Sequence, residues 1–574
     1  MRGRVLTTLF AAGLAMVLVS FAGCAAIPVS SDIQVARSMP SGSGPAAPAG
    51  PERGVDPFRL VREFIEATGS SANGHAAARA FLSRNAAASW DDRASLIVIE
   101  DAPGAAPETG AADRVRRIRV GGTRLGILTA DGSFMPSAGT FAVPLDVVTE
   151  HGEWRISNPP PGVLVEASAL QRNYRQVRVS FVDPNRGTLV PDLRWVPAQP
   201  ASTLPGRVLD LLLAGPSQRL DGAVRSAIPE GVRPRSNVLV GRSGRTVINL
   251  SGVEGMTEQQ RRLVAAQIVA SLDGLVPTPL RLLADGEPLV TGQDEWRPAD
   301  IASYAPPTGP RSDVPGQVVV SGRLRGLNGV IVPGPAGDGR LTVLSAARSN
   351  PAGELLAAVV AGPDGRPQLR VGPMDGDLAL APLDATTMTR PTWRPSGTEL
   401  WTVLNGKAVM GVALSGTSSP LTYQINATEL TQLGPISQLR LSRDGARVAA
   451  VIGGRLVVAA VVTESGTVSL RHPQVLRDGT LPPTVSVDWA RPELLLVASA
   501  GPSPQVSSVS VDGLTRRQLS STNLTGPLTD VAAAPGREVL VADATGLWAY
   551  SDTQEVWEPR LGGVGPGSAP LYPG

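Results

Sequence analysis

The sequence contains very little cysteine, histidine and aromatic side chain. Cys24 is the single cysteine in 574 residues, which excludes an intrachain disulfide and a cysteine-based metal site. The 3 histidines, His75, His151 and His472, lie far apart, and none has a neighbour at metal-binding spacing. Aromatic residues make up 4% of the chain, which argues against a surface that stacks nucleic-acid bases. These shortages predict a protein with no metal, no cofactor and no nucleic-acid partner.

Sequence motifs of common catalytic sites are also missing. We find no G-x-S-x-G nucleophile elbow, and Lys407, the single lysine, is followed by Ala408 rather than by the Ser or Thr of a phosphate-binding loop. The run Asp375-Gly376-Asp377 lacks the further ligands of an EF-hand, so we expect a solvated turn there. The sequence therefore predicts no catalytic residues, although a carboxylate pair assembled from distant segments would escape this search.

The charge of the chain is nearly balanced. Lys and Arg number 52 and Asp and Glu number 50, and loss of Arg2 and Arg4 with an N-terminal signal would leave 50 of each. We therefore expect no net electrostatic attraction to nucleic acid or anionic lipid. One local basic cluster is expected to be a solvated strand edge, with a contact to an acidic cell-wall polymer as the alternative. The cluster consists of Arg114, Arg116, Arg117 and Arg119.

The N-terminus has the pattern of an export signal. Residues 1–4 are basic, residues 5–19 are almost wholly apolar, and the small residues Ala22 and Gly23 precede Cys24. This order is typical of a secretory signal, and small residues before a lone cysteine resemble a bacterial lipobox. We expect a signal peptide at residues 1–23, cleavage between Gly23 and Cys24, and lipidation of Cys24. An ordinary signal or an uncleaved anchor is the alternative.

The lipobox resemblance departs from the usual pattern at Phe21, where Leu is common. Acyl chains on Cys24 would hold the protein on a bilayer, because each buried CH₂ contributes about 0.8 kcal/mol. Residues 24–56 are rich in Ser, Gly, Ala and Pro and offer little to bury, which predicts a disordered tether. A loop packed on the first domain is the alternative.

Residues 57–167 show helical patterns followed by strand patterns. Apolar residues have helical spacing at Phe58, Val61, Phe64 and Ile65, and again at Ala77, Ala80 and Phe81. The runs expected to form strands are residues 96–99, 117–120, 125–128, 141–145 and 154–156. Helices followed by a meander of antiparallel strands predict an α+β domain, and the order is similar to that of NTF2-like folds.

Residues 168–300 predict a second α+β domain. Expected strands cover residues 177–182, 189–196, 247–250 and 281–284, with a turn at residues 285–286. A helix is expected over residues 207–214, with Gly215 as a left-handed C-cap that Pro216 follows. Thr257 and Gln260 are spaced as a capping box at the start of a second helix. Its expected buried face consists of Val264, Ile268 and Leu272.

Five runs in this second domain resemble a known module. They are Leu211–Ser217, Ala227–Val232, Val247–Leu250, Gln267–Leu272 and Ala284–Pro288. Their order and spacing are similar to the GerMN module of spore-germination and envelope proteins. That resemblance implies a non-catalytic module that binds envelope partners.

Residues 301–574 contain an internal repeat. Five segments share a tight turn followed by a short apolar strand, at Gly353, Gly397, Gly445, Glu493 and Arg537, with spacings of 44, 48, 48 and 44 residues. This period predicts an all-β propeller of five or six blades, and pairing of its first and last strands would close the ring. Two tandem β-sandwiches are the alternative. Trp393 and Trp489, which precede two of the turns, are expected to pack between blades. The turns are similar to those of TolB-like propellers, which bind protein partners.

The domain order as a whole resembles the actinobacterial lipoprotein LpqB family. This resemblance implies a lipoprotein anchored on the extracellular face of the cell membrane. It also implies that the protein binds the extracellular part of the sensor kinase MtrB and adjusts signalling through MtrA, with effects on the envelope and cell division. Two alternatives stay open: a hydrolase or lyase of envelope glycans with its site at the propeller mouth, and a passive binder of cell-wall polymer.

Overall fold

The computed structural model describes ten stretches of the chain. They are residues 50–108, 115–236, 238–240, 246–306, 309–349, 351–414, 419–501, 503–562, 564 and 567–574. The predicted signal peptide, the cleavage position at Gly23, the lipidation site Cys24 and the tether up to residue 49 lie outside them. Within these stretches, the helices are all too short or too polar to cross a membrane.

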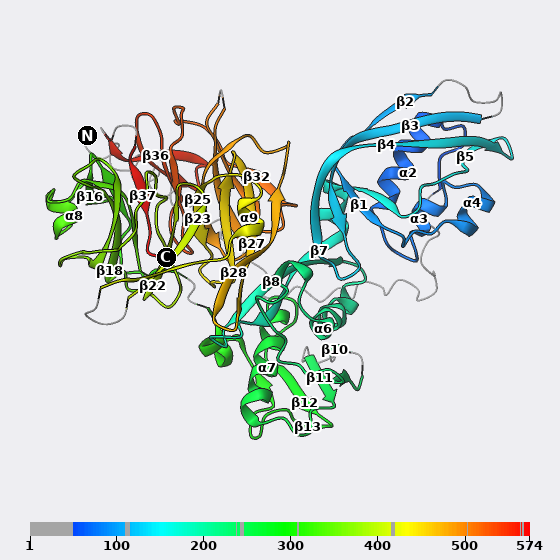
Figure 1. Ribbon diagram of the computed structural model, residues 1–574. Coiled ribbons are helices and arrows are strands. Elements are labelled where there is room, and N and C mark those ends of the chain that lie inside the picture. The colour runs from blue at the N-terminus through cyan, green and yellow to red at the C-terminus, as the bar shows by residue number, and fades with distance from the viewer. Residues whose placement is uncertain are drawn as a thin grey trace, which may run out of the picture. The chain divides into compact units, whose positions relative to one another are not determined.

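The first domain is a mixed sheet with helices packed on it (Figure 1). Its strands lie in the order β5-β4-β3-β1-β6, and β2 also pairs with β3. The elements are α2 (Pro57–Thr68), α3 (Ala76–Arg79), α4 (Arg84–Ser89), β1 (Leu96–Ile99), β2 (Gly104–Pro107), β3 (Val115–Leu128), β4 (Phe134–Glu150), β5 (Glu153–Ile156) and β6 (Val163–Glu166).

The predicted first helix is confirmed as α2. The side chain of Asp56 accepts hydrogen bonds from the backbone N–H groups of Phe58 and Arg59, and so caps its N-terminus. Val61, Phe64 and Ile65 are buried as expected, but Phe58 is 38% exposed. Phe58 is on the same side of the helix as Ile65 but lies in the first turn, at the end of the buried stripe.

Three details of the first domain differ from the sequence predictions. The second helical pattern forms only the short helix α3, and Ala80 is already its C-cap. The predicted strands at residues 117–120 and 125–128 are one strand, β3, with a register shift between Arg124 and Gly126 against β4. The meander is not wholly antiparallel, because β6 returns parallel to β1. Glycines at positions 121, 122 and 126 made β3 look like two shorter strands in the sequence.

The second domain contains a helix pair, a small sheet and a separate hairpin. Strands β7 and β8 form a two-stranded sheet, while β10, β11, β12 and β13 form the larger sheet, with β9 on β11 and β14 on β12. The elements are α5 (Ala167–Asn173), β7 (Tyr174–Val182), β8 (Leu189–Pro197), η1 (Ala201–Thr203), α6 (Leu204–Ala214), η2 (Gln218–Leu220), β9 (Arg233–Pro234), β10 (Leu239–Val240), β11 (Thr246–Ser251), α7 (Glu258–Leu272), β12 (Leu280–Ala284), β13 (Glu287–Pro288), β14 (Glu295–Trp296) and η3 (Pro298–Tyr304).

Local sequence signals in the second domain are largely confirmed. Thr257 and Gln260 form the predicted capping box of α7. The expected left-handed cap at Gly215 is wrong in detail, since its φ of 95° is positive but its ψ of −177° leaves the left-handed helical region. The carbonyl oxygen of Gly215 accepts a hydrogen bond from Arg194, so this residue serves a contact beyond its own helix.

The third domain is a propeller, as predicted. The described residues form six blade sheets, in place of the tandem β-sandwiches of the alternative. The innermost strands β17, β21, β25, β29, β33 and β37 each pack against the next, so the blades form a ring in this order. The last blade joins both ends of the domain, because β37 pairs with β15, which pairs with β16. This pairing confirms the predicted closure.

Each repeat turn found in the sequence joins the first and second strands of a blade. The propeller elements are β15 (Gln317–Val320), β16 (Arg323–Gly326), α8 (Pro335–Asp338), β17 (Val343–Arg348), β18 (Leu355–Ala361), β19 (Pro367–Pro373), β20 (Ala379–Leu380), β21 (Thr392–Trp393), β22 (Glu399–Leu404), β23 (Ala408–Ala413), β24 (Leu421–Gln424), α9 (Thr428–Thr431), β25 (Ile436–Leu441), β26 (Arg447–Ile452), β27 (Arg455–Glu464), β28 (Thr467–Leu476), β29 (Thr484–Arg491), β30 (Leu494–Ser499), β31 (Gln505–Ser510), β32 (Arg516–Gln518), β33 (Asp530–Ala532), β34 (Leu540–Ala542), β35 (Gly546–Ser551), β36 (Val556–Gly562) and β37 (Ala569–Leu571).

The two tryptophans expected between blades lie there. The indole N–H of Trp393 donates to the carbonyl oxygen of Ala347 in the preceding blade at 3.1 Å. That of Trp489 donates to the carbonyl oxygen of Arg440 in its own preceding blade, also at 3.1 Å. Both side chains are buried, so each tryptophan fills a blade interface and also satisfies its single polar group.

Candidate functional site

The three histidines are in unrelated surroundings. His75 is buried, and its Nδ1 lies 2.8 Å from Oδ2 of Asp92, which also accepts a hydrogen bond from Arg79 at 2.8 Å. Burial acts to raise the pKa of Asp92, but His75 and Arg79 outweigh it and the pKa is lowered. His151 is exposed at the turn between β4 and β5, and His472 lines a pocket described below. His75 is therefore a buried structural residue rather than a surface one.

The basic cluster is not at a strand edge. Its described members lie on β3, which has neighbours on both sides. Arg117 makes two hydrogen bonds to the carboxylate of Asp146 on β4, at 2.6 and 3.1 Å, and Arg119 pairs with Glu108. Arg114 lies outside the described residues. Ion pairs across the sheet thus balance much of this charge.

Asp375 and Asp377 lie in the connection between β19 and β20. Among the residues that the structure describes, no group of three or more His, Cys, Asp or Glu side chains is placed to hold a metal ion. The structure therefore offers no set of acidic and imidazole ligands around this turn.

A cluster of buried charged side chains lies where strand β8 meets the other two domains. We call this set of contacts the β8 junction. Its members are Asp192, Arg194 and Trp195 of β8, together with Asp131 and Gly132 of the first domain, Ser217 and Arg219 of the second, and Arg447 and Asp512 of the propeller.

An ion pair of two buried side chains is the centre of the β8 junction. Asp192 is 1% exposed and Arg194 is 0% exposed. Oδ2 of Asp192 accepts hydrogen bonds from Nε and Nη2 of Arg194 at 3.1 and 2.8 Å, and from the backbone N–H of Ser217 at 2.8 Å. Burial acts to raise the pKa of Asp192, but Arg194, Arg219 and the hydrogen bonds outweigh burial and lower it. The carboxylate is therefore charged and fully engaged at neutral pH.

The first domain joins the β8 junction through the turn between β3 and β4. Nη1 of Arg194 donates to the carbonyl oxygen of Asp131 at 2.7 Å, and the backbone N–H of Trp195 donates to the carbonyl oxygen of Gly132 at 2.7 Å. Gly132 has a φ of 76°, and a Cβ there would lie 2.8 Å from the carbonyl oxygen of Trp195. Only glycine permits both this turn and this close approach.

The propeller joins the same strand from the other side. The indole N–H of Trp195 donates to Oδ2 of Asp512 at 2.9 Å, and Nη2 of Arg447 donates to the carbonyl oxygen of Pro191 at 2.5 Å. Leu193 packs in an apolar cluster with propeller side chains, while Leu514 of the propeller packs with the first domain. Strand β8 of the second domain therefore contacts both other domains, through charged and polar side chains as well as apolar ones.

Two repeat turns of the propeller dock on the hairpin of β7 and β8. Arg186, between these strands, donates to the carbonyl oxygen of Asp444 in the third turn. In the fourth turn Glu493 lies 3.4 Å from Arg178 of β7. Glu493 occupies the position at which the fourth repeat has lost its glycine. The departure from the repeat thus coincides with a contact between domains.

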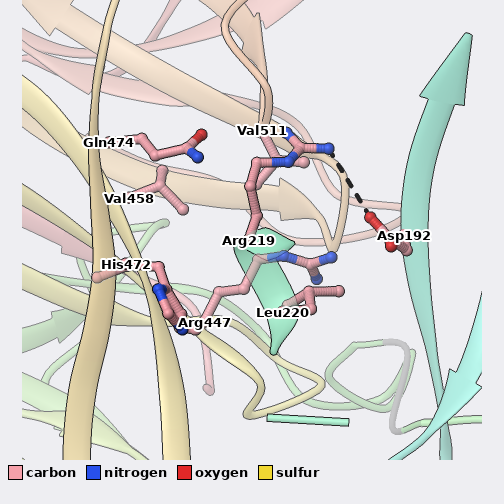
Figure 2. A pocket seen from close by; sticks show the side chains of 10 residues that line it. Asp192, Arg219, Leu220, Arg447, Val458, His472, Gln474 and Val511 are labelled. Carbon is pink, nitrogen blue, oxygen red and sulfur yellow. Dashed lines mark ion pairs between the residues drawn. The ribbon is translucent and has the colours of Figure 1, made fainter. Parts of the chain in front are cut away.

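A small pocket lies beside the β8 junction, as Figure 2 shows. It has a volume of about 20 Å³, room for about one water molecule, and Arg219, Arg447, His472 and Gln474 are among its lining residues. Nη2 of Arg219 donates to the carbonyl oxygen of Leu193 at 3.0 Å and lies 3.7 Å from Oδ1 of Asp192. Burial lowers the pKa of Arg219. The carboxylate of Asp192, which lines this pocket, already accepts hydrogen bonds from Arg194 and Ser217. The pocket is therefore part of the contact between domains.

A more open pocket of about 420 Å³ adjoins it and shares Arg219, His472 and Gln474. The start of β4 forms another wall, where Met135 Sδ lies 3.5 Å from the side-chain amide of Gln474. His472 has a φ of 54° where the pairing of β27 and β28 shifts register, so a β-bulge presents this residue to the pocket.

Acidic side chains from separate blades do converge on the propeller axis, where the linear search could not find them. Asp488 and Asp530 lie on the neighbouring inner strands β29 and β33 and are buried. Asp488 accepts hydrogen bonds from the backbone N–H groups of Trp489 and Ala533, at 2.9 and 3.0 Å. Asp530 accepts from Ser486 and lies 3.5 Å from Arg390. Both carboxylates are bound within the fold, so they do not form an open acid–base pair.

The β8 junction is not among the features predicted from the sequence. Residues 189–196 were expected to be an ordinary returning strand. In the structure β8 is buried on both faces, including Asp192 and Arg194 two positions apart. Two features of the sequence could have indicated it. Asp192 and Arg194 are opposite charges two positions apart within an apolar strand, and the fourth repeat turn has Glu493 where other repeats have glycine.

Family models match three successive parts of the chain. The model described as the lipoprotein LpqB N-terminal domain matches residues 50–171. The model described as sporulation and spore germination, the GerMN module, matches residues 178–290. The model described as the lipoprotein LpqB beta-propeller domain matches residues 316–573. These matches confirm the predicted order of an N-terminal domain, a GerMN domain and a propeller.

Curated relatives are similar over nearly the whole chain. Lipoprotein LpqB of Rhodococcus jostii (strain RHA1) is 33% identical over 589 residues, which cover 97% of this chain and 96% of that protein. Lipoprotein LpqB of Mycolicibacterium smegmatis is 32% identical over 599 residues, 100% of both. A solved structure of TolB from Acinetobacter baumannii is 15% identical with a TM-score of 0.24, over 31% of this chain and 43% of that one, too distant to carry an argument. The matched domains and the full-length similarity show that the chain belongs to the LpqB lipoprotein family.

Proposed function

We propose that this protein is a lipoprotein acylated at Cys24, anchored on the extracellular face of the cell membrane, and active by binding rather than by catalysis. Its partner in this proposal is the extracellular domain of the sensor kinase MtrB, whose signalling through MtrA it adjusts, with effects on the envelope and cell division. Membership of the LpqB family, whose members are named lipoproteins, supports the anchor. The small residues Ala22 and Gly23 before Cys24 resemble a lipobox, and Cys24 would supply the acceptor thiol.

The observation that carries the proposal is the β8 junction. Asp192, Arg194 and Trp195 connect the turn at Asp131 in the first domain to Asp512 in the propeller through buried contacts. Two domains that share such contacts resist independent movement. A partner that holds one domain is therefore held at a defined position relative to the others.

A rigid accessory protein can change a kinase only through differential binding. It shifts the equilibrium between two kinase states by the ratio of its affinities for them, and a protein that binds both states equally shifts nothing. An anchor on the same membrane would also raise the apparent affinity for a membrane kinase, because it raises the effective concentration of the binding domains near it. The anchor and the junction thus contribute separately to one function.

A pull-down with the purified MtrB extracellular domain tests the binding proposal. The wild-type protein should be retained, and so should Arg366→Gln, a control variant at an exposed arginine of the propeller. Absence of a complex in detergent and in crosslinked cells would contradict the proposal. Incubation with peptidoglycan and arabinogalactan tests the competing hydrolase, for which released fragments would be the positive result.

The Cys24→Ser variant tests the anchor by itself. We expect it to lose metabolic labelling with a fatty acid and to leave the membrane fraction, because a free hydroxyl cannot replace the acyl acceptor thiol in lipoprotein maturation. Unchanged membrane attachment would contradict lipidation. It would not bear on kinase binding, which the pull-down tests separately.

A further inference from the structure

The axis of the propeller holds a cluster of three arginines, two of them buried, that the proposed function does not use. Arg390 precedes β21, Arg440 lies on β25, and Arg443 follows β25 in the third repeat turn. Arg440 is 4% exposed and Arg443 is 6% exposed. Asp488 and Asp530 are the carboxylates that act on this cluster electrostatically. Three guanidinium groups therefore face two carboxylates in a region shielded from water.

Two of these arginines reach across the ring. Nη1 of Arg390 lies 3.5 Å from Oδ2 of Asp530. Strand β21, which follows Arg390, and strand β33, which contains Asp530, are three blades apart in the ring of six described blades. Arg443 donates from Nη2 to the carbonyl oxygen of Ala533 at 3.0 Å and from Nη1 to that of Pro573, after β37. These contacts bring the blades' polar groups together on the axis, around Arg440.

Arg440 itself is only partly satisfied. Its Nη1 lies 3.4 Å from the carbonyl oxygens of Arg390 and Pro391. Its Nε and Nη2 are buried and have no hydrogen-bond partner among the described residues. A buried guanidinium stays charged and carries five N–H donors, so unpaired donors on it are costly. Burial, with Arg390 adding to it, lowers the pKa of Arg440 to about 10, while Asp488 and Asp530 act to raise it.

The two unpaired nitrogens form one edge of the guanidinium. Elsewhere in this protein the same Nε and Nη2 edge binds both oxygens of a carboxylate, as in Arg117 with Asp146 and Arg311 with Asp313. Carboxylate and phosphate present two acceptor oxygens at the spacing of this edge, which makes such pairs short and directional. The complement that Arg440 lacks is thus an oxyanion.

We propose that the propeller axis binds a small oxyanion, a carboxylate or a phosphate, on the Nε and Nη2 edge of Arg440. The excess of one guanidinium over the carboxylates in the cluster favours an anion there over a neutral molecule. The bound anion would balance the guanidinium of Arg440 in the third blade, which lies near that of Arg390 from the second blade. It would therefore stabilise the closed ring without forming part of the kinase-binding surface.

Titration calorimetry and thermal unfolding of the full-length protein in detergent test this site, with sodium acetate and sodium phosphate as separate probes. Sodium chloride at matched ionic strength is the reference. We expect a saturable rise of Tm and a measurable binding heat with one of the two oxyanions, which also identifies its class. Arg440→Lys keeps the charge but removes the two-nitrogen edge, so we expect affinity to fall roughly tenfold to a hundredfold.

Arg340→Lys is the matched control, since Arg340 is an exposed arginine of the propeller outside the axis. We expect it to bind the oxyanion like the wild-type protein. Equal oxyanion responses of the wild type and Arg440→Lys would overturn the proposal. So would the absence of any saturable response beyond that of chloride, which would mean that water satisfies Arg440. Circular dichroism of each variant shows whether it is folded before binding is compared.

Discussion

The blade interfaces of the propeller and the β8 junction are both buried, but they are held together in different ways. Between blades, apolar side chains and the indole rings of Trp393 and Trp489 dominate, and each indole satisfies its N–H on the preceding blade. At the β8 junction, Asp192 and Arg194 are charged and depend on each other. Shortening an apolar side chain lowers stability in proportion to the buried volume that is lost. Removing one partner of a buried ion pair leaves the other charge buried without its partner, which lowers stability sharply.

This contrast has a consequence for function. A blade interface is specified by a repeated local pattern and holds neighbouring blades together, and Leu193 of β8 also packs in the cluster that contains Trp489. The β8 junction is made once, by residues far apart in the chain, and connects three domains. Variants at the two places should therefore separate the stability of the propeller from the coupling between domains.

The largest expected effect is at the centre of the β8 junction. Asp192→Asn preserves shape but removes the buried carboxylate partner of Arg194, which keeps only its ion pair with the more exposed Asp131 at 3.2 Å, and this loss should cost about 3–5 kcal/mol. Differential scanning calorimetry should show the domains unfolding in separated transitions, with the propeller transition kept. Asp364→Asn, at an exposed carboxylate, is the control. A uniform loss of stability in every transition would contradict a role confined to the junction.

The next effect is in the propeller. Trp489→Phe removes the indole N–H that donates to the backbone carbonyl oxygen of Arg440 and leaves a cavity between blades. We expect the propeller to lose about 1–3 kcal/mol of stability. Denaturant unfolding followed by circular dichroism should show a less stable propeller. Trp548→Phe is a comparison at a less buried tryptophan on β35. If Trp489→Phe instead separated the domains, the contrast between the two regions would be wrong.

Trp195→Phe tests a single hydrogen bond between the β8 junction and the propeller. The substitution keeps most of the apolar surface but removes the donor to Asp512, a buried carboxylate that retains hydrogen bonds from Ser510 and Leu514. We expect a loss of about 1–3 kcal/mol in coupling between the first domain and the propeller. Limited proteolysis between the domains should accelerate, and an unchanged cleavage rate would argue against this contact.

Acid should weaken the β8 junction before it weakens the blade interfaces. The folded pKa of Asp192 is lowered, mainly by Arg194 and Arg219 acting against burial. Its stabilisation is therefore complete above the ordinary carboxyl pKa of about 4 and is lost as the pH falls through the lower folded value. Calorimetry from neutral pH to strongly acidic pH should show this loss in the wild type and its absence in Asp192→Asn. The same acid dependence in both proteins would assign the effect to other carboxylates.

The smallest effect is expected at an exposed contact between the same domains. Arg178 is about half exposed and lies 3.4 Å from Glu493, so water screens the ion pair. Arg178→Gln should change stability by about 0–1 kcal/mol in the same calorimetric assay. A loss as large as that of Asp192→Asn would show that burial does not set the strength of contacts at this interface.

Local patterns in the sequence predicted much of the fold. The capping box at Thr257, the hairpin turn at Asp285 and Gly286, and the repeated propeller turns each need only neighbouring residues, so each could be recognised from spacing. The six described blades agree with the predicted five or six, and closure followed from the need to cover strand edges.

Long-range contacts could not be predicted in this way. Nothing near Asp192 in the sequence indicates Ser217, and nothing near Trp195 indicates Asp512, because these partners are 25 and 317 residues away. Arg390 and Asp530 on the propeller axis could not be paired from the sequence either, because they are 140 residues apart. The predicted lipidation site at Cys24 lies outside the described residues and stays a prediction.

The autophosphorylation rate of the MtrB kinase, reconstituted in membrane vesicles with saturating lipoprotein, tests the central claim most directly. We predict that the wild-type protein changes this rate, and that Asp192→Asn still binds the kinase but loses most of that change because its domains no longer move together. A rate that Asp192→Asn changes as strongly as the wild type would contradict the account.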